Sequence, residues 1–66
     1  MYVVTVFIGG RKRACQKGTF EEVLSYMWTW QSTTWCGEDL VFLLASPEDQ
    51  WYRCKMVNGS WDIRRW

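Results

Sequence analysis

The three cysteines are the side chains with the strongest intrinsic reactivity in this 66-residue chain, which contains no histidine. Cys36 is followed by Gly37, Glu38 and Asp39, and carboxylates beside a thiol disfavour its reactive thiolate form. Because histidine is missing, so is the usual general base near neutral pH. We therefore expect no catalytic residues and no enzymatic activity.

The cysteines do not form a metal-binding pattern either. Cys15, Cys36 and Cys54 share no Cys-x-x-Cys spacing, and no histidine is present to complete a zinc site. An odd number of cysteines favours a reducing compartment, so we expect a cytoplasmic protein without cofactor or metal. Cys15 and Cys54 alternate with polar neighbours, so both are expected to be core residues.

An aromatic and basic set of residues near the C-terminus is the clearest candidate for a function. Asn58 and Gly59 predict a two-residue turn that pairs Val57 with Ser60 and joins strands over residues 51–57 and 60–66. In that register one face is the expected core face and carries Tyr52, Cys54, Met56, Trp61 and Ile63. The other face carries Trp51, Arg53, Lys55, Asp62, Arg64 and Trp66.

The net charge of +1 conceals a segregation of charge along the chain. The cations Arg11, Lys12, Arg13 and Lys17 come first. An acidic block over residues 18–50 follows, and the C-terminal strands are again basic. Two acidic pairs, at 38–39 and 48–49, are expected to form an acidic lobe that engages a basic groove on a partner. Arg53 is predicted to lie opposite Arg64, and this pair of like charges favours an anionic partner for the face that carries them.

The first half of the chain predicts a hairpin and a helix. Tyr2–Ile8 is typical of a strand, Gly9 and Gly10 of a two-residue turn, and residues 11–16 of a basic edge strand. A three-residue loop would instead move Cys15 to the other face, beside the other set of first-strand side chains, so the register of this hairpin stays open. Thr19 and Glu22 form a capping-box pattern, which predicts a helix over residues 19–31, although residues 28–31 also fit an extended segment.

Residues 31–39 are expected to form a loop that carries Trp35. Leu40–Ala45 is an unbroken apolar run, as expected for a central strand covered on both faces. These elements predict an α+β fold in β-β-α-β-β-β order, with one helix packed on one face of an antiparallel sheet and a single domain over residues 1–66. No segment is long and apolar enough to span a membrane, and we expect no membrane partner.

The leading prediction is a small non-catalytic binding protein that occupies a surface of another macromolecule, with a host or cognate protein as partner. The expected partner-binding residues are Trp35, Trp51, Arg53, Lys55, Arg64 and Trp66. In size and style the chain resembles accessory proteins of phages and mobile elements, which implies an inhibitor of a host protein or defence complex, for example one that is anti-CRISPR-like. The alternative is a small nucleic-acid-binding module that uses the aromatic and basic sheet face. An oligomerising module is a third possibility, since chains of this length often need a partner for stability.

Overall fold

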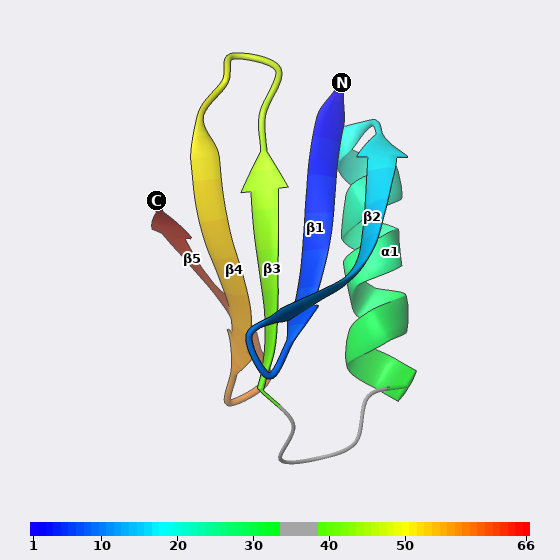
Figure 1. The fold of residues 1–66 in the computed structure, drawn as a ribbon, viewed down its shortest axis with the longest axis vertical. Coiled ribbons are helices and arrows are strands. Elements are labelled where there is room, and N and C mark those ends of the chain that lie inside the picture. Colours follow the sequence, from blue (N-terminus) through cyan, green and yellow to red (C-terminus); the bar gives the residue numbers. More distant parts are fainter. Residues whose placement is uncertain (34–38) are drawn as a thin grey trace.

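The computed structural model describes residues 1–33 and 39–66, which form one helix and five strands. The bounds of these elements are β1 (Tyr2–Ile8), β2 (Arg11–Gly18), α1 (Phe20–Thr33), β3 (Leu40–Ala45), β4 (Trp51–Val57) and β5 (Ser60–Arg65). All strand pairs are antiparallel, in the order β2-β1-β3-β4-β5, so that β2 and β5 form the edges (Figure 1). The predicted α+β fold with one helix is confirmed.

The C-terminal hairpin has the register that the sequence predicts. Val57 lies opposite Ser60, and the pairing continues without a shift to Tyr52 opposite Arg65. Asn58 and Gly59 have φ angles of 51° and 81°, which is the left-handed conformation that a type I′ turn requires at both positions. A turn of this type matches the twist of the two strands, so the local sequence alone fixes which side chains share a face.

A β-bulge divides the first hairpin into two registers. Phe7 lies opposite Lys12, whereas the preceding residue of β1, Val6, lies opposite Ala14. Arg13 is therefore the extra residue of β2, with no residue of its own opposite on β1. A bulge of one residue moves every later side chain of the strand to the other face.

The bulge decides the position of Cys15. In an uninterrupted two-residue hairpin Cys15 would lie opposite Val4, whose side chain is fully buried. With the bulge it lies opposite Thr5 and is exposed, so the prediction that Cys15 is a core residue is wrong. Ala14, instead of Cys15, lies on the face of the sheet that carries the helix, and it packs against the core.

The capping box begins the helix as predicted. The Thr19 backbone N–H donates to the Glu22 carboxylate at 2.9 Å, and the Glu22 N–H donates to the Thr19 hydroxyl at 3.2 Å. The hydrogen bond from the Thr19 backbone, followed by the contact with its hydroxyl, lowers the pKa of Glu22. The helix extends to Thr33, so an extended conformation for residues 28–31 is excluded.

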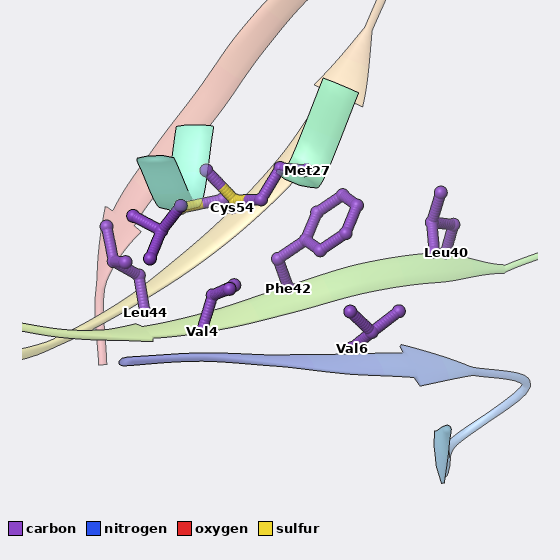
Figure 2. Packing of buried hydrophobic residues seen from close by; sticks show 8 residues of the cluster. Val4, Val6, Met27, Leu40, Phe42, Leu44 and Cys54 are labelled. Carbon is purple, nitrogen blue, oxygen red and sulfur yellow. The ribbon is translucent and has the colours of Figure 1, made fainter. Parts of the chain in front are cut away.

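The core lies between α1 and one face of the sheet (Figure 2). Its fully buried side chains come from three strands and the helix: Val4, Val6, Phe42, Cys54, Val23 and Met27. Trp61 extends this core towards β5, because its ring packs edge-on against Phe42 and Trp28 with centroids 5.6 and 5.5 Å apart.

One helix is too narrow to cover five strands. Strands lie about 4.8 Å apart, so the outer two are separated by roughly 19 Å, whereas a helix is about 10–12 Å across. Figure 1 shows α1 beside β1 and β2, with β5 at the far side of the sheet. As a result Ile63, which was expected in the core, is 50% exposed. The expectation that both faces of β3 are covered is also wrong, because Val41 and Leu43 are only half-buried.

Candidate binding face

The face of the sheet that points away from α1 carries most of the predicted partner-binding residues, and we call it the open face. Arg53 lies opposite Arg64 across the β4–β5 ladder. The backbone N–H of Trp66 donates to the carbonyl of Trp51 at 2.8 Å, which extends the same pairing by one residue. Trp51 is 44% exposed and Trp66 is 76% exposed. Their binding role stays a prediction, and the predicted anchor Trp35 lies outside the described residues.

An apolar groove of about 370 Å³ runs across the open face. Its floor consists of Phe7, Val41 and Leu43, and Trp66 and Arg53 border it on the side of β4 and β5. The register of β1 with β3 places Phe7 directly opposite Val41. Apolar side chains that face outward in such a group are typical of a surface that another molecule covers.

The floor of this groove was not found from the sequence. Phe7 and the two β3 residues, Val41 and Leu43, belong to apolar runs, and such runs predict strands that are buried on both faces. The number of predicted helices could have revealed this exposed floor. A chain with a single predicted helix cannot cover both faces of a five-stranded sheet.

A second, more polar depression of about 240 Å³ adjoins the groove, and here cations and carboxylates alternate. Lys55 Nζ lies 3.5 Å from Asp39 Oδ1, and Arg64 Nε donates to both oxygens of Asp62 at 3.2 Å. The register predicts Lys55 opposite Asp62, which is observed, but the ion pair of Lys55 is with Asp39. These groups are largely exposed, so each pair adds little to stability.

Asp39 therefore belongs to the basic face, contrary to the prediction that it joins Glu48 and Asp49 in an acidic lobe. Its former partner in that prediction, Glu38, lies outside the described residues. The pairing of Arg64 with Asp62 also offsets the repulsion expected from the apposition with Arg53. In the described part of the chain, no carboxylate lies within ion-pair distance of Arg53, which leaves its guanidinium available beside the apolar floor.

A separate line of cations follows the β2 edge. Arg11, Lys12, Arg13 and Lys17 are all exposed, and residues 1–33 and 39–66 contain no ion pair to any of them. Lys12 and Lys17 lie opposite Phe7 and Val3, so their side chains project on the open face.

Two of the three cysteines, Cys15 and Cys54, lie within the described residues, and Cys36 lies outside them. Burial raises the pKa of the Cys54 thiol to about 11, so this thiol stays protonated and weakly nucleophilic at neutral pH. Cys15 is exposed, and the Thr5 hydroxyl donates to its sulfur at 4.0 Å. Over the described ranges, no three side chains among His, Cys, Asp and Glu gather into a metal-binding group.

Over the same ranges, no helix has both the length and the apolar character needed to cross a membrane. Comparison with known proteins adds no relative: no family model, no curated protein and no solved structure matches the chain. The proposals below therefore depend on the chain's own geometry.

Proposed function

We propose that the chain is a non-catalytic binding protein that uses the open face to occupy a surface of another protein. The observation that carries this proposal is the exposed groove with its floor of Phe7, Val41 and Leu43. Trp66 borders it, together with Arg53, which has no acidic partner among the described residues. Tryptophan and arginine beside a desolvated apolar centre are the composition of protein-binding hot spots. An inhibitory role, in which the face blocks a surface that a host protein needs, is the finer form of this proposal.

The charge arrangement favours a protein over a nucleic acid at this face. Asp39 and Asp62 lie among the cations and are paired with Lys55 and Arg64. Carboxylates in these positions repel phosphate groups and reduce the field that a polyanion would follow. On a protein surface the same mixture of signs pairs with complementary charges and sets the orientation of binding.

The test compares binding by the wild-type chain and by variants of the open face. The immobilised chain captures partners from a lysate, and the captured protein is then purified and titrated. We expect Trp66→Ala and Arg53→Glu each to weaken binding by more than about 1 kcal/mol, which is roughly fivefold. Trp28→Ala is the control, because Trp28 is a partly exposed tryptophan, at 46% against 76% for Trp66, on the helix side of the sheet. Circular dichroism must show that this variant is folded, because the Trp28 ring also packs against Trp61. Equal affinity for all four proteins would reject the open face as the binding surface.

A nucleic-acid-binding module is the second candidate, and the exposed cations along β2 are the observation that favours it. Arg11, Lys12, Arg13 and Lys17 together form a positive edge without a described acidic partner. Labelled single-stranded and duplex oligonucleotides, titrated at low and moderate salt, test this candidate. Affinity that falls steeply with salt, and that Lys12→Glu reduces, would support it. Absence of binding at low salt would exclude it.

A further inference from the structure

The two edges of the sheet differ in how well they are protected against pairing with another strand. The β2 edge contains the bulge at Arg13 and carries four exposed cations, and both features oppose the addition of a further strand. The β5 edge follows β4 without a register shift, and its central residue, Ile63, is half exposed. Strand pairing is therefore favoured at β5.

The outward-facing backbone groups of β5 can be assigned from its hydrogen bonds. Trp66 N–H donates to the carbonyl of Trp51, so residue 66 and every second residue before it direct their backbone groups towards β4. Trp61, Ile63 and Arg65 consequently direct their N–H and C=O groups away from the sheet. In the described part of the chain, β4 is the only strand that pairs with β5.

We propose that β5 is a self-association edge, at which a second copy of this chain pairs antiparallel in a register centred on Ile63. In this register Asp62 of each copy lies opposite Arg64 of the other, on the side of the open face. These positions form non-hydrogen-bonded pairs, in which the two Cα atoms are about 4.5 Å apart and the side chains are closest. Opposite charges in cross-strand positions stabilise such a ladder.

The side chains on the other face fit the same register. Ile63 lies against Ile63 of the second copy, so that each covers the apolar surface that α1 leaves exposed. Trp61 lies opposite Arg65 of the second copy, which is a favourable cation–aromatic combination. Each outward-facing residue of β5 then exchanges backbone hydrogen bonds with its opposite residue, and a two-fold axis relates the two chains.

The neighbouring registers are disfavoured by charge. Residues whose backbone groups point away from β4 must lie opposite residues of the same kind in the other copy. The pairing is therefore always centred on a residue, and the nearest alternative registers are centred on position 62 or position 64. A centre at position 62 places Asp62 opposite Asp62, and a centre at position 64 places Arg64 opposite Arg64. The sequence Trp61-Asp62-Ile63-Arg64-Arg65 thus selects the register centred on Ile63.

This association goes beyond the proposed function and leaves the apolar groove of the open face uncovered, because the floor of that groove lies on β1 and β3. The two-fold axis is perpendicular to the joined sheet, so both open faces lie on the same side. Pairing of two six-residue strands makes a small interface, and the dimer is expected to dissociate on dilution.

Charge exchange between two variants tests the proposal. Multi-angle light scattering should give a mass approaching twice 7.9 kDa for the wild-type chain at high concentration. Asp62→Arg and Arg64→Asp each place like charges opposite one another, and each should raise the dissociation constant of the dimer by roughly tenfold or more. An equimolar mixture of these two variants should form a heterodimer, because both pairs between positions 62 and 64 are then again of opposite sign. The chain that carries both substitutions should form a homodimer for the same reason.

Lys12→Asp on the β2 edge makes the same charge change as Arg64→Asp and is the matched control, which should dimerise like the wild type. Circular dichroism confirms that each variant is folded. A wild-type chain that stays monomeric at every concentration overturns the proposal. Single variants that dimerise as well as the wild type, or a mixture that does not associate, also overturn it.

A cross-link tests the register directly. Opposite residues of a hydrogen-bonded pair have Cα atoms about 5.5 Å apart, which suits a disulfide. The test chain carries Cys15→Ser, Cys36→Ser and Cys54→Ala, because Cys54 lies opposite position 63 on β4 and would compete for it within one chain. In this chain Ile63→Cys should therefore give a cross-linked dimer under mild oxidation. Val57→Cys is the control, because Val57 is exposed but lies on β4. Cross-linking at both positions to the same extent, or none at position 63, contradicts the register.

Discussion

Asp39 and Asp62 are the residues that most change the expected chemistry of the open face. The sequence places Asp39 in an acidic block, yet its carboxylate pairs with Lys55 of β4, which lies 16 residues further along the chain. Asp62 pairs with Arg64 two residues away. Together they convert a basic surface into one of mixed charge, in which Arg53 is the cation that borders the apolar groove without an acidic partner in the described residues. Specificity at this face is therefore expected to depend more on Arg53 than on the total positive charge.

The buried thiol of Cys54 makes the stability of the chain depend on alkaline pH. Its pKa is raised from 9.0 to about 11 by burial, so the unfolded chain loses this proton at a lower pH than the folded chain. The contribution to stability is complete below pH 9 and is lost as the pH rises towards 11. We expect about 2 kcal/mol to be lost between pH 8 and about pH 10.5, measured by urea denaturation.

Cys54→Ala provides the comparison for this pH dependence. The variant leaves a small cavity and is less stable at every pH, but it has no thiol to ionise. Its stability should therefore fall less steeply than that of the wild type over the same range. Parallel curves for the two proteins would show that another group causes the alkaline loss.

The elements whose turn or cap is specified by a few adjacent residues were predicted well. Asn58-Gly59 fixed the register of a whole hairpin, and the Thr19–Glu22 pair located the start of the helix. The face of Cys15 was not predictable from such signals. It depends on one extra residue in β2, and Gly9-Gly10 and the following cations are compatible with a regular hairpin as well as a bulged one. A bulge reflects packing between the finished strand and the helix, which a local pattern does not contain.

The helix cap gives a prediction at this scale. Thr19→Ala removes the acceptor for the Glu22 N–H and should destabilise the chain by about 1 kcal/mol in urea denaturation. Thr29→Ala is the matched control, because the Thr29 hydroxyl only donates back to the Ser25 carbonyl within the helix. That change should leave stability within about 0.5 kcal/mol. Because the pKa of Glu22 is lowered, the cap should also weaken as the pH falls below about 4.5. Equal losses for both alanine variants would contradict the assigned cap.

Two single-residue deletions test the bulge. Deletion of Arg13 removes the extra residue and keeps Ala14 opposite Val6 and Cys15 opposite Thr5. The fold and the exposure of Cys15 should therefore be preserved, so that a thiol reagent still labels it in the native chain. Deletion of Ala14 instead places Arg13 opposite Val6 on the core side, and should destabilise the chain by about 1–3 kcal/mol. A greater loss of stability on deletion of Arg13 than on deletion of Ala14 would show that the bulge itself is required.

For the molecule as a whole, the ratio of one helix to five strands explains which surfaces are left uncovered. The open face has no helix in the described part of the chain. On the opposite face α1 lies beside β1 and β2, and its Trp28 reaches Trp61 of β5 but leaves Ile63 half exposed. A groove of about 250 Å³ between Phe20 and Ile63 marks this shortfall on the helix side. The sequence predicts the numbers of helices and strands but not the lateral position of the helix, which depends on where Val23 and Met27 find partners. Val41, Leu43 and Ile63 were therefore assigned to the wrong environment for a common reason.

A chain of this length has little stability to spare. At roughly 0.05–0.15 kcal/mol per residue its free energy of unfolding is about 3–10 kcal/mol. Phe42 is fully buried and contacts Trp61, so Phe42→Ala should cost about 3–5 kcal/mol and unfold much of the population at 25 °C. Near-ultraviolet circular dichroism and tryptophan fluorescence would record this loss. Phe42→Leu keeps most of the volume and should remain folded. A folded Phe42→Ala variant of nearly normal stability would show that the core does not depend on this ring.

The difference between the two edges also determines how far association can proceed. A sheet with two equivalent free edges can recruit copies at both ends, and repeated addition produces a fibril. In this chain the bulge and the cations close the β2 edge, while pairing at β5 consumes the available edge of both copies. The valence of each chain in edge-to-edge assembly is then one, so growth terminates at a finite particle with β2 at both of its ends.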